Sequence, residues 1–416
     1  MNIKITPNKL SGTVRIPPSK SVAHRLIISA ALAKGTSRIS NIYLSKDIIA
    51  TIDAMKALGA DIVVDGDTAT VHGIEKAPEK AVINCNESGS TLRFLIPVVC
   101  ALGVECTFIG AGKLPERPIT PYIEELPKHG IEFDFDRANN GEILPCTVRG
   151  KLTSGTFKIA GDISSQFITG LLFALSILDG DSEIQLTSHL ESRPYVDITL
   201  DCLKNFGAEI TETPSGYIAK GGQKLLAKDG RVEGDYSQAA FFEVANCLGC
   251  KINIEGLNVN SFQGDKKIVE ICSKIVYNEN DSLSSFSLDC SDIPDLVPIL
   301  TVLACFCSGR SYITNVARLR IKESDRLEAV SSCLNKLGGK VTAYADRLEI
   351  EGVERLNGGI AESYNDHRIA MAMAVAAIKC TSPLTILNAQ CVEKSYPEFF
   401  KDYSVLGGKI NVINLE

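Results

Sequence analysis

The run Pro18–Ile42, PSKSVAHRLIISAALAKGTSRISNI, holds the pattern that decides the fold of this chain. It opens with the polar Pro18–Ser21 and continues through the apolar Leu26–Leu32, which is typical of a buried helix. Gly35 then marks a turn, and Ser37–Ile42 is typical of a strand. The run therefore predicts a polar opening, a helix, a turn and a strand, in that order.

A second helix follows the strand in the predicted unit. Apolar residues recur every three or four positions along Ile48–Leu58, and this stripe stops at Gly59. The same stripe runs along Leu327–Leu337 and stops at Gly338. A one-sided apolar stripe that ends at glycine is typical of an amphipathic helix on a protein surface.

The polar opening returns five more times along the chain. The further openings are Glu87–Arg93, Asp162–Gln166, Asp235–Gln238, Asp292–Asp295 and Asn365–Arg368. Each precedes an apolar helix and a β-rich segment, so the chain contains six copies of one unit. First helices such as Leu171–Leu178 and Ile369–Ile378 are apolar nearly all round, which predicts burial on every face. We therefore expect one inner and one outer helix per unit, with sheet between them, and three units per domain.

Length and composition limit the class of protein. A chain of 416 residues is too long for one ordinary core, which favours two domains. Its net charge of -7 argues against broad nucleic-acid binding, which needs a basic surface. No apolar run reaches the roughly 18 residues of a membrane span. The alternating start Met1–Leu10 also lacks the apolar core of a signal peptide, so we expect a cytoplasmic protein.

The 14 cysteines are scattered, mostly within apolar segments. Cysteine there behaves as a small hydrophobic residue, and a reducing compartment explains the pattern better than disulfides do. Cys247–Cys250 forms a CxxC pattern, but no second pair and no nearby histidine complete a zinc-binding set. We therefore expect no metal.

The openings place polar groups where several helices begin. Helix N-termini carry unpaired backbone N–H groups and about half a positive charge, so several aimed at one cleft form an anion site. Asp235–Gln238 is typical of a helix cap alone. The other five openings carry residues that suit phosphate, carboxylate or hydroxyl groups.

Each candidate residue also has an ordinary structural interpretation. For the charged run Arg318–Arg326, RLRIKESDR, the alternative is a solvated face, and for Arg117 it is a surface charge. Helix capping is the alternative for the serines, a turn for Gly89 and a core histidine for His367. By its neighbours alone, Lys394 is typical of a surface residue.

The candidates together nevertheless form a coherent set. The cations are Lys20, Arg25, Arg117, Lys322, Arg326, Arg368 and Lys394, and the acids are Asp295 and Glu323. This set predicts a metal-free enzyme that joins two small, anionic substrates. One acid would take a hydroxyl proton, and the other would handle a second proton.

The motifs resemble those of the 5-enolpyruvylshikimate-3-phosphate synthases, from Pro18–Ser21 through Lys322–Arg326 and Asn365–Arg368 to Lys394–Pro397. The resemblance implies an α/β fold, a two-domain inside-out α/β barrel built from six repeated βαβαββ-type units. The domains would be 14–230 and 1–13 plus 231–416, with the active site in the cleft between them.

The resemblance also implies a reaction. The enolpyruvyl group of phosphoenolpyruvate would pass to the 5-hydroxyl of shikimate 3-phosphate through a tetrahedral intermediate, with release of phosphate and without cofactor or metal. This step belongs to the shikimate pathway, which leads to chorismate and the aromatic amino acids. We expect a monomer with these two small molecules as partners and with no nucleic-acid or membrane partner.

Carried over by position, the resemblance implies two sets of binding residues. For shikimate 3-phosphate they are Lys20, Ser21, Arg25, Ser164, Ser165, Gln166, Ser192, Asp295 and Lys322. For phosphoenolpyruvate they are Lys20, Gly89, Arg117, Gln166, Arg326, Arg368 and Lys394. Asp295 would be the base for the attacking hydroxyl. Glu323, alone or together with Lys20, would protonate the methylene carbon of phosphoenolpyruvate.

Two residues depart from the family pattern. Arg318 stands where some members have an asparagine that touches the shikimate ring, and Glu87 replaces a common asparagine near Gly89. Gly89 itself is retained, and members with glycine there tend to be inhibited by glyphosate. The sequence therefore predicts sensitivity to glyphosate.

Three alternatives compete with this interpretation. The sister UDP-N-acetylglucosamine enolpyruvyl transferases have a reactive cysteine five residues before the loop arginine, where this chain has Gly112. A catalytically inactive anion-binding protein of the same fold would lack an acid, yet Asp295 and Glu323 are both present. An RNA 3′-phosphate cyclase is disfavoured by the acidic composition.

Overall fold

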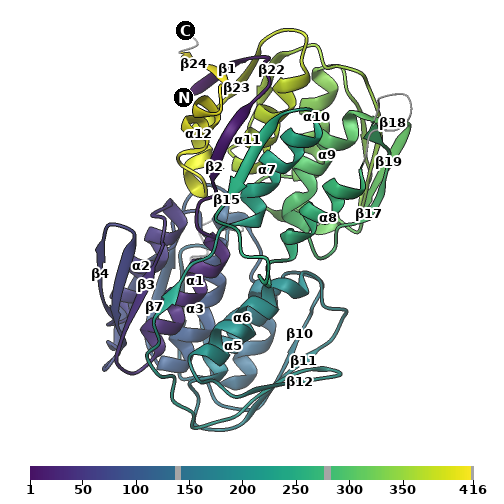
Figure 1. Ribbon diagram of the computed structural model, residues 1–416. Coiled ribbons are helices and arrows are strands. Elements are labelled where there is room, and N and C mark those ends of the chain that lie inside the picture. Colours follow the sequence, from purple (N-terminus) through teal and green to yellow (C-terminus); the bar gives the residue numbers. More distant parts are fainter. Residues whose placement is uncertain (136–141, 276–282, 414–416) are drawn as a thin grey trace. The chain divides into compact units, whose positions relative to one another are not determined.

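A computed structural model describes residues 1–135, 142–275 and 283–413 of the chain (Figure 1). Its contacts divide the chain into two compact units, Met1–Pro17 with Gly234–Glu416, and Pro18–Glu233. Each unit contains helices and small mixed sheets, which confirms the α/β class. The predicted folding domains, 14–230 and 1–13 plus 231–416, stay a prediction.

The Pro18–Glu233 unit repeats one four-stranded sheet three times. The sheets are β14-β3-β5-β4, β6-β7-β9-β8 and β10-β11-β13-β12. In each, the first two strands are parallel and the other neighbours are antiparallel. The strands are β3 (Thr36–Ser40), β4 (Asp61–Asp65), β5 (Thr68–His72), β6 (Lys80–Asn84), β7 (Glu105–Ile109), β8 (Glu132–Phe135), β9 (Cys146–Arg149), β10 (Thr156–Ile159), β11 (Ser182–Leu186), β12 (Ile210–Thr213), β13 (Gly216–Ala219) and β14 (Gly230–Arg231). The repeat predicted from the sequence is therefore visible in the sheets.

The other unit contains two four-stranded sheets of the same pattern, β22-β23-β1-β24 and β17-β19-β21-β20, and two parallel pairs, β15-β2 and β16-β18. The strands are β1 (Asn2–Thr6), β2 (Ser11–Arg15), β15 (Lys251–Glu255), β16 (Leu283–Ser284), β17 (Ser287–Asp289), β18 (Cys307–Ser308), β19 (Arg310–Thr314), β20 (Lys340–Ala343), β21 (Leu348–Glu351), β22 (Gly359–Glu362), β23 (Leu384–Leu387) and β24 (Lys409–Ile413). The N-terminal strand β1 pairs with β23 on one side and with β24 on the other. This unit is therefore completed by both ends of the chain.

Two kinds of helix accompany the sheets. The apolar helices are α1 (Lys20–Leu32), α3 (Gly89–Leu102), α5 (Ser165–Leu175), α7 (Tyr236–Cys247), α9 (Val297–Cys305) and α11 (His367–Ala376). The others are α2 (Lys46–Ala57), α4 (Thr120–Glu125), α6 (Arg193–Asn205), α8 (Lys267–Lys274), α10 (Arg326–Lys336) and α12 (Phe399–Val405). Every residue of α9 and α11 is buried, as predicted for helices that are apolar all round. In their own unit α7, α9 and α11 lie side by side (Figure 1).

Glycine ends the amphipathic helices as predicted. Gly59 follows α2 with a φ of 104°, and Gly338 follows α10 with a φ of 91°. A side chain is strained at such angles, so glycine is the residue that allows the chain to leave the helix and enter the next strand.

The cysteines fill the cores. All 14 lie in the described residues, none forms a disulfide, and all but Cys247 and Cys272 are buried. This confirms their prediction as small hydrophobic residues. Among the described residues, no helix is both long enough and apolar enough to cross a membrane.

Candidate active site

Charged side chains gather where three helices of the Met1–Pro17 and Gly234–Glu416 unit begin. Arg326 opens α10, Arg368 is the second residue of α11, and Asp295 lies in the short 3-10 turn before α9. Asp366 caps α11 by accepting a hydrogen bond of 2.9 Å from the backbone N–H of Arg368. This cap fixes where α11 starts, so it also fixes where Arg368 lies.

Asp295 and Arg326 are at the centre of this group. The Asp295 carboxylate accepts 2.9 Å from Arg326 Nη1 and 2.7 Å from Arg368 Nη2. Arg326 Nε donates 2.8 Å to Asp366, whose carboxylate is fully buried. Burial alone would lower the pKa of Arg326, but Asp366, Asp295 and Glu323 outweigh it and raise that pKa. Arg326 therefore stays charged although its side chain is only 3% exposed.

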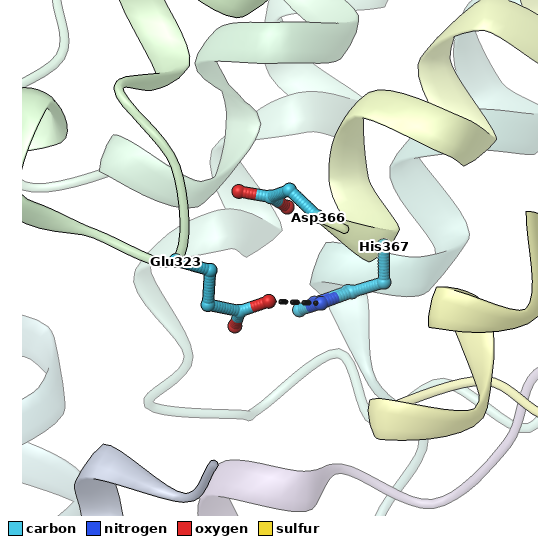
Figure 2. A group of neighbouring side chains, drawn as sticks. All are labelled: Glu323, Asp366 and His367. Carbon is cyan, nitrogen blue, oxygen red and sulfur yellow. Dashed lines mark hydrogen bonds and ion pairs between the residues drawn. The ribbon is translucent and has the colours of Figure 1, made fainter. Parts of the chain in front are cut away.

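Glu323 faces three basic groups (Figure 2). His367 Nδ1 lies 3.0 Å from Glu323 Oε2, and Arg326 and Lys394 lie 3.8 and 3.9 Å from the carboxylate. Burial would raise the pKa of Glu323, but His367, Arg326 and Lys394 together hold it well below its usual range. Loss of those positive charges would therefore raise the pKa of Glu323.

Lys394 corrects one sequence prediction. Its neighbours in the sequence suggested a surface lysine, yet it is 6% exposed and Nζ donates 2.7 Å to the carbonyl of Asn365. The contact spans 29 residues, so local sequence could not show it. Lys394 belongs to the same group as Glu323, and we call Asp295, Glu323, Arg326, Asp366, His367, Arg368 and Lys394 the acid–guanidinium cluster.

In the described parts of the chain, Glu323, Asp366 and His367 are the one group whose ligand atoms lie close enough together for a metal ion (Figure 2). Arg326 already contacts both carboxylates, and Lys394 adds a second positive charge. A divalent cation would be repelled by these groups, whereas an anion would be attracted. The cluster therefore favours an anionic ligand.

The Pro18–Glu233 unit carries its own basic groups at helix starts. Lys20, the first residue of α1, forms an ion pair of 2.8 Å with Asp47 of α2. Arg25 is buried one turn further along α1, and its N–H groups donate to the Thr199 and Thr169 hydroxyls and to the carbonyls of Ser21 and Tyr195. A guanidinium has five N–H groups, so Arg25 has one left for a ligand.

Gly89 and Arg117 are in close contact. A Cβ built on Gly89 would lie 2.6 Å from Arg117 Nη1 and 2.8 Å from its Cζ. Only glycine therefore allows the start of α3 to approach this guanidinium. We call Ser88, Gly89 and Arg117 the glycine cradle.

Gln166 is tied to the start of α3. Its Nε2 donates 3.0 Å to Ser90 Oγ, and its Oε1 accepts 2.8 Å from Arg93 Nη1. Arg93 also donates 2.9 Å to the carbonyl of Pro118, next to Arg117. Gln166, Arg93 and the glycine cradle are thus parts of one network.

The predicted serines occupy helix starts. Ser164 caps α5 by accepting from the N–H of Gln166, and Ser165 is the first residue of that helix. Ser192 precedes α6 with a positive φ of 56° and makes no side-chain cap bond. Ser21 is the second residue of α1. These hydroxyls lie at helix N-termini, where anions and hydroxyl groups are favoured.

Lys322 and Arg318 belong to the 3-10 helix Ala317–Ile321 and its end. Lys322 is half-buried, whereas Arg318 is buried and its guanidinium donates to the carbonyl of Ser291. That contact directs Arg318 to the protein backbone, in keeping with the doubt that the sequence raised about this position. The charged run is therefore not a solvated face throughout.

The loop near Arg117 also bears on the sister family. Gly112 has a φ of 57°, and a Cβ there would lie 2.6 Å from Cδ of Glu87. A cysteine at this position would collide with the Glu87 carboxyl group. A cysteine at position 112 would therefore require the flexible Glu87 side chain to shift.

Three residues of these networks were missed in the sequence. Asp47 pairs with Lys20, Arg93 bonds to Gln166, and Asp366 pairs with Arg326. Arg93 and Asp366 stand within sequence motifs quoted above for other residues. A signal existed for Asp366, because an acid directly before an apolar helix is typical of a cap. Asp47 meets Lys20 only through the packing of α1 on α2.

Comparison with known proteins gives consistent matches. A family model described as EPSP synthase (3-phosphoshikimate 1-carboxyvinyltransferase) matches residues 5–403. The 3-phosphoshikimate 1-carboxyvinyltransferase of Clostridium novyi (strain NT) is 47% identical, over 99% of this chain and 98% of the relative. That of Clostridioides difficile (strain 630) is 44% identical, over 100% of this chain and 99% of the relative. The solved structure of EPSP synthase from Acinetobacter baumannii superposes with a TM-score of 0.81 at 25% identity, covering 99% of this chain and 100% of that one.

Proposed function

The chain belongs to the EPSP synthase (3-phosphoshikimate 1-carboxyvinyltransferase) family, and we propose that the groups described above are the ones that hold and convert its two substrates. The enzyme transfers the carboxyvinyl group of phosphoenolpyruvate to shikimate 3-phosphate in the shikimate pathway. The observation that supports the residue assignment best is the contact of Asp295 with both Arg326 and Arg368. One candidate base thereby lies beside two candidate anion-binding groups.

Phosphoenolpyruvate carries a carboxylate and a phosphate, so it needs several cations. We assign it to Arg326, Arg368 and Lys394 of the acid–guanidinium cluster, and to Lys20, Gly89, Arg117 and Gln166. A guanidinium binds a carboxylate or a phosphate through two parallel hydrogen bonds, which fixes orientation as well as charge. The same cations would stabilise the charge on the departing phosphate.

Shikimate 3-phosphate presents one phosphate, one carboxylate and hydroxyl groups. We assign it to Lys20, Ser21, Arg25, Ser164, Ser165, Gln166, Ser192, Asp295 and Lys322. Arg25 would contribute a single N–H, because protein acceptors take the other four.

Asp295 is the proposed base. Two guanidinium groups favour its ionised form, which can accept the proton of the 5-hydroxyl as that oxygen bonds to the central carbon of phosphoenolpyruvate. The methylene carbon takes up a proton in the same addition and gives the tetrahedral intermediate. Loss of phosphate and of one methyl proton then restores the double bond.

Glu323 is the proposed donor of the methylene proton, and its surroundings suggest when it acquires one. His367, Arg326 and Lys394 keep it ionised. When the anions of phosphoenolpyruvate bind Arg326 and Lys394, those charges are neutralised and the pKa of Glu323 rises. Substrate binding would in this way prepare Glu323 to act as the acid.

The activity is tested by phosphate release. With phosphoenolpyruvate, we expect release when shikimate 3-phosphate is the acceptor and none when UDP-N-acetylglucosamine is. A coupled phosphate assay measures both. Release with the UDP-sugar alone would mean that the enzyme is a member of the sister family, and release with neither would favour an inactive anion-binding protein.

A Gly89→Ala variant tests the glycine cradle. The added methyl group would press on the Arg117 guanidinium at 2.6 Å, so the arginine must move away from its ligand. We expect KM for phosphoenolpyruvate to rise at least about tenfold, since one charged contact contributes about 1.5 to 3 kcal/mol. We expect glyphosate to inhibit the wild type, and to inhibit the Gly89→Ala variant less strongly.

The control for this variant is Gly66→Ala. A Cβ on Gly66 would meet nothing within 4 Å, and its φ of 58° makes the control the more demanding one, since it adds local backbone strain. It adds a methyl group to the same unit away from the proposed site. Unchanged steady-state constants and unchanged glyphosate inhibition in Gly89→Ala would contradict the assignment of Gly89 and Arg117.

The remaining predictions concern the arrangement of the whole protein. We propose an inside-out barrel of six units in two domains, and a cytoplasmic monomer. The three repeated sheets of the Pro18–Glu233 unit support the six-unit description. Light scattering after size exclusion tests the monomer, for which the expected mass is 44.8 kDa.

A further inference from the structure

Four buried side chains of the Pro18–Glu233 unit form a continuous chain of hydrogen bonds. His24 Nδ1 lies 2.8 Å from Thr51 Oγ1, which lies 2.7 Å from Thr91 Oγ1. Thr91 Oγ1 in turn donates 2.7 Å to Ser88 Oγ. All four residues are at most 1% exposed. The mechanism proposed above gives none of them a role, although Ser88 belongs to the glycine cradle.

These hydrogen bonds connect helices α1, α2 and α3. Lys20 and His24 are four residues apart on α1, and Asp47 and Thr51 are four apart on α2, so each pair shares a helix face. The 2.8 Å ion pair between Lys20 and Asp47 is thus followed, one turn along, by the 2.8 Å bond between His24 and Thr51. Thr91 extends the connection to Ser88, which caps α3 directly before Gly89.

The direction of the bonds follows from the number of hydroxyl hydrogens. Thr91 gives its only hydroxyl hydrogen to Ser88, so it accepts from Thr51. Thr51 then has none left for His24, and His24 Nδ1 must be the donor. Nε2 is therefore without hydrogen, which agrees with its burial without a hydrogen-bond partner, because an orphaned acceptor costs less than an orphaned N–H.

The charge state of His24 agrees with this direction. Burial, Lys20 and Arg25 hold the pKa of His24 well below its usual range. Thr51 faces it from α2 and the Phe94 ring of α3 meets it edge-on. Within the described residues, the charged groups that act on its pKa are Lys20 and Arg25, and no carboxylate favours the charged form. His24 therefore remains neutral, and the hydrogen bonds keep a single donor-to-acceptor direction from His24 to Ser88.

We propose that the His24–Thr51–Thr91–Ser88 chain is a positioning element that fixes Lys20 and the glycine cradle relative to each other for binding phosphoenolpyruvate. The inference rests on the phosphoenolpyruvate roles assigned above to Lys20, Gly89 and Arg117. The contact between Gly89 and Arg117 is too close for a methyl group, so a shift of a few tenths of an ångström at the start of α3 changes it. Misplacement of reacting or binding groups by 1 Å can lower a rate about a hundredfold, so a smaller shift should have a measurable effect.

Thr51→Val is the variant that interrupts the chain with little change of shape. It leaves the His24 N–H without its acceptor and Thr91 without its donor. We expect KM for phosphoenolpyruvate to rise about tenfold. KM for shikimate 3-phosphate, which shares only Lys20 with these groups, should rise less than about threefold. Thr51→Ser keeps the hydroxyl and should restore KM to within about threefold of the wild type.

Thr301→Val is the matched control. Thr301 is also fully buried, and its hydroxyl bonds only to the carbonyl of Val297 within α9. It controls for the general cost of replacing a buried threonine. We expect its steady-state constants to equal those of the wild type.

NMR of the imidazole nitrogens in the wild type tests the donor-to-acceptor direction of these hydrogen bonds without any substitution. His24 should show hydrogen on Nδ1 and should not titrate near pH 6.5, where an ordinary histidine does. Hydrogen on Nε2, or titration near 6.5, would overturn the proposal.

The kinetic outcomes are equally decisive. A folded Thr51→Val variant with the wild-type KM for phosphoenolpyruvate would contradict the proposal. A Thr51→Ser variant whose KM is raised as much as that of Thr51→Val would contradict it too. An inactive wild type would refute the proposed function instead, and the NMR spectrum would still report on the chain itself.

Discussion

Replacing Glu323 by glutamine is expected to lower kcat about a thousandfold. General acid–base groups contribute about a hundred- to ten-thousandfold to rate, and the amide cannot give a proton to the methylene carbon. Glutamine keeps the shape of the side chain, and loss of a negative charge beside Arg326 does not weaken anion binding. KM for phosphoenolpyruvate should therefore not rise.

Solvent isotope incorporation separates this role from a structural one. In heavy water the wild type should place deuterium on the methylene carbon during addition and elimination, and the variant should do so about a thousandfold more slowly. Glu328→Gln, an exposed acid on α10, is the matched control. A Glu323→Gln enzyme that retains more than a tenth of kcat would remove Glu323 from the mechanism.

The same variant should also change the pH dependence of stability. The folded-state pKa of Glu323 is lower than its usual 4.5, so the ionised carboxylate stabilises the folded state above that pH. This contribution is lost as the pH falls through the folded-state value. Urea unfolding should show a stability difference between wild type and variant at pH 7 that shrinks below about pH 4.

Replacing Arg326 by methionine should have the largest effect on stability. Arg326 contacts Asp366, which is fully buried, and Asp295. Breaking a buried ion pair by removing one partner costs about 3 to 5 kcal/mol, because the other charge is left without compensation. We expect urea unfolding to show a loss of this size, and activity to fall below detection.

Arg320→Met is the control for this loss. Arg320 and Asp325 form a pair of similar length, 2.7 Å, but their side chains are 32% and 37% exposed. Exposed pairs contribute about 0 to 1 kcal/mol, so burial and not distance decides the difference. Equal losses in the two variants would contradict this explanation.

A double variant distinguishes stability from binding. Arg326→Met combined with Asp366→Asn removes both charges of one pair, and should recover part of the stability lost in the single variant. Activity should not return, since phosphoenolpyruvate would still lack a guanidinium. Recovery of activity with stability would mean that Arg326 has only a structural role.

Much of the fold was predictable because it repeats and because its signals are local. Gly59 and Gly338 end helices through their own backbone angles, and the apolar Ile369–Ile378 is buried on every side. Such features depend on residues within one or two turns, so the sequence contains them directly.

The features that the sequence did not predict depend on contacts between residues far apart in the chain. Lys394 looked like a surface lysine because its partners, Asn365 and Glu323, are 29 and 71 residues away. Arg93 meets Gln166 across 73 residues. The spacing of residues in the sequence does not predict these contacts, because they form only once the helices have packed.

The position of β1 has a consequence for synthesis on the ribosome. Asn2 of β1 pairs with Ile413 of β24, and Ile3 with Ile386 of β23, so this sheet needs residues from both ends of the chain. The Pro18–Glu233 unit is continuous and can complete its contacts while translation proceeds. β1 must therefore wait for β23 and β24, which are made much later. A nascent chain halted once residue 233 has left the ribosome, but before β15 and β23 have, should therefore protect Pro18–Glu233 from proteases and leave β1 and β2 open to cleavage.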